Sequence, residues 1–109
     1  MGEEGARLTG TAVEVAEALV DDLSSLGEVT SRKMFGGVGI FANGSMFTIV
    51  DGDGRVFFRV NDATAPRYVE AGSEKHSRMP YWSVPHSVLH DPDEIVAWGT
   101  QALQAAQAK

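Results

Sequence analysis

The sequence predicts an α+β protein: an antiparallel β-sheet meander with flanking helices, in the order α-β-β-β-β-α-β-α. Three observations support this prediction. Apolar residues recur at helical spacing near the start, residues 32–60 hold short apolar runs between glycine-bearing turns, and an Asp-Pro pair at 91–92 opens a last amphipathic stretch. With 109 residues, the chain is expected to form a single domain, 11–109, after a polar, flexible N-terminus over 1–10.

The first helix is predicted over residues 11–26. Thr11 and Glu14 have the spacing of a capping box, in which each side chain bonds the free backbone amide of the other. Gly27 is a suitable end, because glycine adopts the left-handed conformation without a Cβ clash. The apolar residues that share one face of this helix are Val15, Ala16, Leu19, Leu23 and Leu26.

Four strands are predicted where the pattern changes to short, extended apolar runs. Asn43-Gly44 is a strong hairpin signal, because a type I′ turn needs positive φ at both central positions. The run Asp51–Gly54 turns the chain again. The predicted strands are Lys33–Phe35, Val38–Phe41, Met46–Val50 and Arg55–Val60.

The C-terminal part is predicted to hold a helix, an aromatic strand and a last helix. The Asn-Asp pair at 61–62 can cap a helix that ends near residue 71. Met79–Pro85 contains aromatic residues between two prolines, which places this strand at an edge or end of the sheet. Asp91 and the proline after it begin the last helix, 92–107, because aspartate caps free amides and proline needs no amide partner.

Composition excludes several classes of protein. Zero cysteines exclude a disulfide framework, thiolate zinc sites and thiol catalysis. No apolar run approaches the ~18 residues of a membrane span, and the acidic start lacks the positive charge of a signal peptide. A cytoplasmic protein without membrane contact is therefore expected. A protein that binds duplex DNA on its own usually has a basic surface and a high pI. This chain has a net charge of −6 and a pI of 4.9.

The acidic balance is uneven, and the central segment is basic. Residues 1–29 carry seven acids against one base, whereas residues 30–78 carry seven bases against five acids. Trp82 is expected in the core, because a small core needs large side chains. Tyr81, its neighbour on the strand, should point to the opposite face. From charge clustering and strand phase, the residues expected to contact a partner are Arg32, Lys33, Arg59 and Tyr81.

No catalytic residue, metal site or cofactor is predicted. His86 and His90 have the i, i+4 spacing of a zinc pair, but a helix cap follows them at once and no glutamate sits beside the first as a base. Ser73, Glu74, His76 and Ser77 lie together on a polar loop without the elbow motif of a serine hydrolase. These residues are expected to be ordinary surface residues.

Several runs of residues follow one another along the chain as short motifs. RKMFGG at 32–37, GIF at 39–41 and GSMF at 44–47 resemble the opening signature of the TfoX/Sxy N-terminal domain family. MPYWSVP at 79–85 and DPDE at 91–94, followed by Trp98, are similar to its closing signature. The resemblance covers roughly residues 26–106, nearly the whole domain.

The resemblance implies a two-layer, secretion-chaperone-like fold and no catalytic residues. Family members include regulators of bacterial natural competence, which act as coactivators with a cyclic-AMP receptor protein at promoters. The chain is therefore expected to be a non-catalytic regulatory or protein-interaction module whose partner belongs to the transcription machinery. Full-length regulators carry a second, helical domain, and this chain is expected to be a stand-alone N-terminal domain.

Other interpretations remain open at this point. Direct nucleic-acid binding through the central basic strip would show a steep dependence on salt. A small-molecule or enzymatic site would require a pocket in which several of Arg59, His76, Tyr81 and His86 converge. Residues 70–79 also look shorter than the family's usual hairpin, which would leave a gap at the sheet edge for a second copy in a homodimer.

Overall fold

A computed structural model describes residues 10–34, 36–76 and 79–108 as one five-stranded antiparallel sheet with helices against it. The sheet order is β1-β2-β3-β4-β5, and the predicted α+β meander is confirmed, with α3 as an additional short helix. The elements are α1 (Gly10–Asp22), η1 (Ser24–Leu26), β1 (Val29–Met34), β2 (Gly37–Ala42), β3 (Ser45–Val50), β4 (Val56–Arg59), α2 (Ala65–Glu70), β5 (Tyr81–Ser83), α3 (His86–Leu89) and α4 (Pro92–Gln107).

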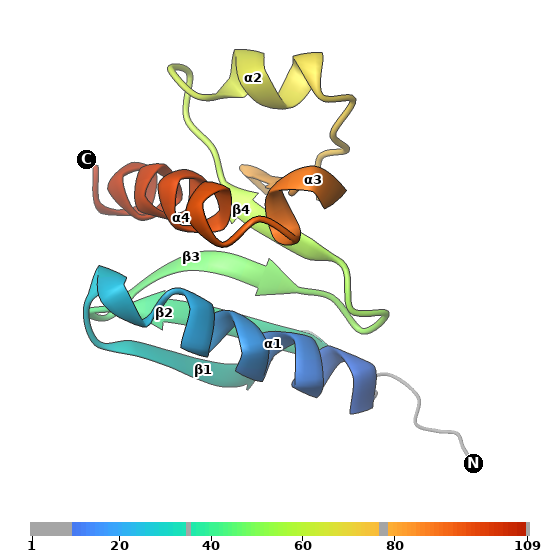
Figure 1. Cartoon of the computed structure of the whole chain (residues 1–109), viewed down its shortest axis with the longest axis vertical. Coiled ribbons are helices and arrows are strands. Elements are labelled where there is room, and N and C mark those ends of the chain that lie inside the picture. The colour runs from blue at the N-terminus through green and yellow to red at the C-terminus, as the bar shows by residue number, and fades with distance from the viewer. Residues whose placement is uncertain (1–9, 35, 77–78, 109) are drawn as a thin grey trace.

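The two long helices pack against the same face of the sheet, which we call the helix face. In Figure 1, α1 lies over β1 and β2, and α4 lies along β3 and β4. Gly99 allows α4 to approach closely, because a Cβ at this position would lie 2.9 Å from Cδ2 of Leu23. The main core between the helices and this face includes Ile40, Phe47 and Phe58, each 0% exposed.

The opposite side of the sheet carries a different set of residues, and we call it the open face. Residues paired across an antiparallel ladder point to the same side. One such row contains Arg32, Gly39, Ile49, Phe57 and Ser83. The buried side chains of α1, α2, α3 and α4 in the main core all lie on the helix face, so within the described residues no helix packs over the open face.

Two predicted helix starts are wrong. The helix α1 already includes Gly10, so Thr11 lies inside the first turn and is not the N-cap of a capping box. The helix ends at Asp22, and a separate 3₁₀ turn completes the stretch predicted as helix to residue 26. Before α2, residues 61–64 form a turn in which Oδ1 of Asn61 accepts from the Thr64 amide at 3.0 Å. The helix therefore begins at Ala65 rather than at 61–62.

Other local predictions are confirmed. Asn43 and Gly44 have φ angles of 53° and 88°, as the type I′ hairpin turn requires. Oδ1 of Asp91 accepts from the amides of Asp93 and Glu94 at 3.0 and 3.1 Å, which makes it the cap of α4.

The strand β1 begins at Val29, four residues before the predicted start, because it pairs with β2 over its whole length. Residue 35 and the predicted flexible residues 1–9 lie outside the described residues.

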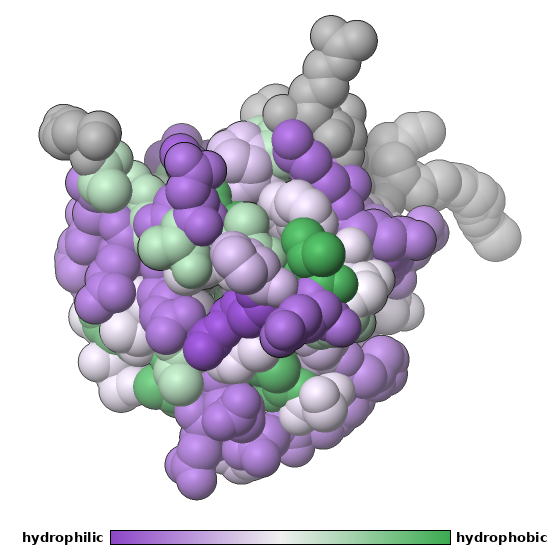
Figure 2. Space-filling model, turned by 90° about the horizontal axis from the view of Figure 1, so that it is seen from above, coloured by the Kyte–Doolittle hydropathy of each residue, from purple (hydrophilic) through white to green (hydrophobic). Residues whose placement is uncertain are grey.

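The end of the molecule that carries α2 has a mostly hydrophilic surface. Figure 2 shows this end from above, with apolar residues scattered singly among polar ones. Val69 on α2 is 61% exposed, and a single exposed apolar residue of this kind needs no partner. Within the described part of the chain, no helix is both long and apolar enough to cross a membrane.

Candidate functional site

Arg32 and Lys33 lie on opposite faces of the sheet. Arg32 pairs with Gly39 on the open face, whereas Lys33 pairs with Val38 on the helix face. Lys33 lines a shallow hollow beneath α1 together with Glu17. Both side chains are exposed, but the strand alternation separates them. The four residues expected to contact a partner therefore do not share one face of the sheet.

The open face carries three arginines that lie over aromatic rings. The distances from the guanidinium carbon to the ring centroid are 5.4 Å for Arg32 over Phe41, 5.3 Å for Arg55 over Phe57, and 5.8 Å for Arg59 over Tyr81. Such stacking positions the planar guanidinium and leaves its N–H groups able to bind carboxylate or phosphate. The contact prediction did not include Arg55, although its alternation with Phe57 and Arg59 placed it on the same face.

Two of these arginines lack an acidic partner. Arg55 forms an ion pair with Glu74, with 2.7 Å between Nη2 and Oε1. Within residues 10–34, 36–76 and 79–108, neither Arg32 nor Arg59 has an ion-pair partner. The Nε atom of Arg59 is buried without a hydrogen-bond acceptor. The open face therefore presents two uncompensated positive charges.

Tyr81 is buried beneath Arg59. It lies on the face opposite Trp82, as predicted, but only 3% of its surface is exposed, so its ring is not available for the contact expected of it. Burial raises the pKa of Tyr81, and the Arg59 guanidinium beside the ring partly offsets this increase. The ring belongs to a small second core with Ile49 and Phe57. Tyr81 thus supports an arginine of the open face.

An apolar cavity of about 220 Å³ lies on the open face, and we call it the methionine cavity. Met34, Ile49 and Met79 line it, together with His76, whose ring packs edge-on against Phe57. Gly39 of β2 leaves room for Met34 and for the neighbouring Met46. A Cβ at Gly39 would lie only 2.7 Å from Sδ of Met34 and 2.8 Å from Sδ of Met46.

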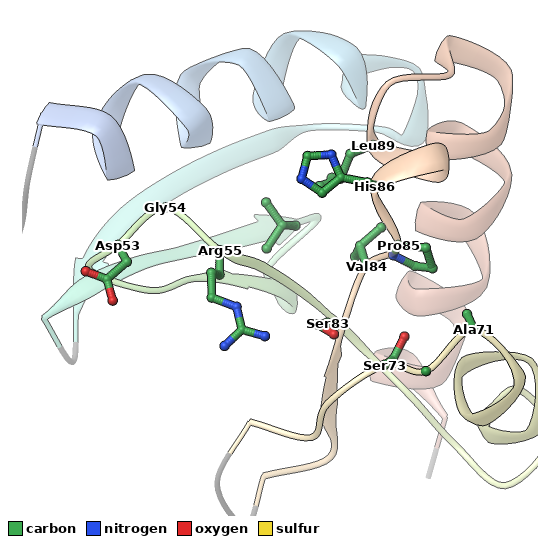
Figure 3. A pocket seen from close by; sticks show the side chains of 12 residues that line it. Asp53, Gly54, Arg55, Ala71, Ser73, Ser83, Val84, Pro85, His86 and Leu89 are labelled. Carbon is green, nitrogen blue, oxygen red and sulfur yellow. The ribbon is translucent and has the colours of Figure 1, made fainter.

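A second hollow, of about 360 Å³, lies between the β3–β4 turn, β5 and α3 (Figure 3). Of the residues whose convergence would indicate an enzyme, only His86 lines it. Figure 3 shows the His86 ring and the Arg55 guanidinium on separate sides of the opening. Oγ of Ser83 accepts from the Glu74 amide, and no hydrogen bond joins a serine to a histidine within the described residues. The hollow does not contain a nucleophile–base pair.

His86 begins the short helix α3 and His90 follows its last residue. The rings of His86 and His90 are 5.1 Å apart between centroids, and both residues are exposed. The described residues contain no group of three or more His, Asp or Glu arranged to hold a metal ion. A pair of histidines alone falls short of the three or four protein ligands of a zinc site.

Comparison with known proteins adds the family. The family model of the TfoX N-terminal domain matches residues 21–106, most of the chain. The chain belongs to the TfoX N-terminal domain family. A curated relative of this TfoX N-terminal domain is "DNA transformation protein TfoX1" of Aliivibrio fischeri (strain ATCC 700601 / ES114), 37% identical over 63 residues. That match covers 58% of this chain and 30% of the relative, so the chain corresponds to less than half of that protein.

The family match includes the whole sheet of this TfoX N-terminal domain. All five strands lie within the matched residues 21–106, and so do Arg32, Arg59 and the methionine cavity. Beside β5, within the described residues, Lys75 makes an isolated antiparallel bridge to Trp82. That this hairpin is shorter than the one usual in the family stays a prediction.

Proposed function

We propose that this TfoX N-terminal domain is a non-catalytic regulatory module of bacterial competence that binds a protein partner through the open face of its sheet. The observation that supports this function is the pair Arg32 and Arg59. Both stack on aromatic rings of a face that no described helix covers, and neither has an ion-pair partner among the described residues. Uncompensated, pre-positioned arginines are typical of sites that recognise carboxylates.

The proposed partner belongs to the transcription machinery, and the domain acts on it as a coactivator. Family membership and the name of the relative, DNA transformation protein TfoX1, support a role in competence. The net charge of −6 favours binding to another protein over direct binding to DNA, whose phosphates are negatively charged. The homodimer expected from the abbreviated hairpin remains part of this proposal, with the edge beyond β5 as its contact.

Direct nucleic-acid binding is the second candidate function. Three arginines on aromatic rings of one sheet face favour it, since such a surface can bind phosphates and bases. Each phosphate contact would contribute about 0.7 to 0.9 to the slope of log affinity against log salt. With Arg55 already paired to Glu74, a slope of roughly 2 is expected if this candidate is correct.

The experiment compares Arg32→Glu with Lys33→Glu. The two variants make the same charge change at adjacent exposed residues of β1, but on opposite faces of the sheet. Tagged domains are used to capture partners from the source bacterium with and without nuclease. The captured proteins are identified, and binding is measured again with the purified partner.

We expect Arg32→Glu to lose a transcription protein that Lys33→Glu retains, whether or not nuclease is added. Equal capture by both variants would show that the open face is not the binding site. Capture that nuclease abolishes, with a salt slope of roughly 2, would replace protein binding with nucleic-acid binding.

A further inference from the structure

We propose that the segment of the partner that docks on the open face is extended and acidic and carries one bulky apolar side chain. That side chain enters the methionine cavity, and flanking carboxylates pair with Arg32 and Arg59. The inference rests on the proposed function and specifies the chemistry of its partner.

The two arginines without an ion-pair partner favour an anionic segment. Arg32 and Arg59 have no ion-pair partner in the described part of the chain, and the carboxylates nearby are already engaged. Glu74 holds Arg55, and Oδ1 of Asp51 accepts from the amides of its own turn at Asp53 and Arg55. A partner that brings carboxylates would therefore complete two arginine contacts without displacing an existing ion pair.

The methionine cavity lies in the same part of the face as the two arginines. Ile49, which lines the cavity, pairs with Gly39, and Gly39 pairs with Arg32. On its other side Ile49 pairs with Phe57, two residues before Arg59. A segment that runs obliquely from Arg32 to Arg59 would therefore pass Ile49, at the edge of the cavity.

The size of the cavity indicates a single side chain as its occupant. Its volume of about 220 Å³ is below the roughly 300–1,000 Å³ of small-molecule sites. Met34 and Met79 are partly exposed, and methionine side chains adapt their shape to an apolar guest. Leucine or phenylalanine of a partner would bury apolar surface here, as anchor residues do in protein interfaces.

The sheet geometry sets the spacing of the acidic residues. Arg32 on β1 is in register with Phe57 on β4, three strand spacings or about 14 Å away, and Arg59 lies two residues farther along β4. The two arginine backbones are therefore about 16 Å apart. An extended segment advances about 3.3 Å per residue, so roughly five residues separate the two carboxylates. The test peptide is therefore an acetylated octamer with three glutamates, a central leucine–phenylalanine pair, and three more glutamates.

The experiment is an NMR titration of the full chain, labelled at the methionine methyl groups, with this octamer. Two control peptides replace either all glutamates with glutamine or the leucine–phenylalanine pair with two serines. We expect the acidic, apolar octamer to shift the Met34 and Met79 methyl signals, and each control peptide to bind at least tenfold more weakly. Arg32→Glu and Met79→Ala should each weaken binding by a similar factor, while Lys33→Glu should not.

Several results would overturn the inference. Absence of methyl shifts at millimolar octamer, or equal binding of the serine peptide, would exclude the apolar anchor. Unchanged affinity of a folded Met79→Ala domain would show that the cavity is not used. Shifts that follow protein concentration would assign the face to a second copy, and shifts with oligothymidylate alone would assign it to nucleic acid. The proposed function fails separately, if partner capture is the same for Arg32→Glu and Lys33→Glu.

Discussion

The hydroxyl of Tyr81 donates a hydrogen bond of 2.9 Å to the backbone carbonyl of Met46. Tyr81 is on β5 and Met46 is on β3, so the bond crosses β4 on the open face and ties the edge of the sheet to its centre. The same ring lies under the Arg59 guanidinium. One tyrosine therefore fixes both the strand packing and the position of an arginine.

Replacing this tyrosine should reduce stability without affecting recognition. We expect Tyr81→Phe to lower the free energy of unfolding by about 0.5–1.5 kcal/mol, because the Met46 carbonyl loses its donor. Partner binding should stay within twofold, since the ring beneath Arg59 is retained. Urea unfolding and the octamer titration measure the two quantities. Unchanged stability with lost binding would make the hydroxyl a direct contact.

Gly37 and Gly99 should respond differently to the same substitution. A Cβ on Gly37 would lie 2.2 Å from the backbone oxygen of Val50, so Gly37→Ala must push β2 and β3 apart. We expect a loss on the order of 1–3 kcal/mol. At Gly99 the nearest atom is the flexible end of Leu23, and alanine favours a helix by about 1 kcal/mol.

Gly99→Ala should therefore be within about 1 kcal/mol of the wild type. Thermal and urea unfolding of both variants provide the comparison. Equal losses would mean that the β2–β3 contact at Gly37 does not control stability.

Tyr68 should make the fold sensitive to alkaline pH. Its side chain is 2% exposed and packs against Trp98, with ring centroids 4.9 Å apart. Burial raises its pKa above the ordinary 10.0, and the charge of Arg67 offsets part of the increase. The unfolded chain then loses the proton at a lower pH than the folded protein does. The stability from this tyrosine is fully present below about pH 10 and is lost as pH rises above it.

The measurement is the free energy of unfolding at about pH 9 and about pH 11 for the wild type and Tyr68→Phe. We expect the wild type to lose more stability over this interval than the variant. Tyr81→Phe is a useful second variant, because burial also raises the pKa of Tyr81. Identical pH dependence of the wild type and Tyr68→Phe would contradict this assignment.

The cap of α4 provides a local test. Oδ1 of Asp91 accepts from two amides at the start of this helix, and we expect Asp91→Ala to lower the free energy of unfolding by about 0.5–2 kcal/mol. Asp91→Asn retains a capping oxygen and should lose much less. Urea unfolding measures both. Equal losses would mean that the carboxylate charge rather than the cap is responsible.

Strand periods, turn residues and the α4 cap were predictable from the sequence because their physics is local. Asn43-Gly44 needs only two positive φ angles, and Asp91 needs only the amides that follow it. The start of β1 at Val29 was missed, because exposed residues there give no apolar signal and pairing with β2 supplies the strand.

The prediction of contact residues depended partly on sequence and partly on tertiary packing. Strand alternation alone already places Arg32 and Lys33 on opposite faces, so their separation could have been predicted from the sequence. The burial of Tyr81 was not, because it depends on Ile49, Phe57 and Met79 meeting across the sheet. The methionine cavity likewise depends on contacts between strands, since Gly37 lies against the backbone of Val50 and Gly39 against the side chain of Met34.

The alternation of Arg32 and Lys33 also has a consequence for how this domain can diverge. On β4 the same alternation places Val56 and Phe58 in the main core and Phe57 and Arg59 on the open face, so inserting one residue within this strand would exchange the two sets. Substitutions at Arg32 and Arg59, by contrast, leave both buried clusters unchanged. The charge of the open face can therefore change by point substitution, while the strand lengths stay constant.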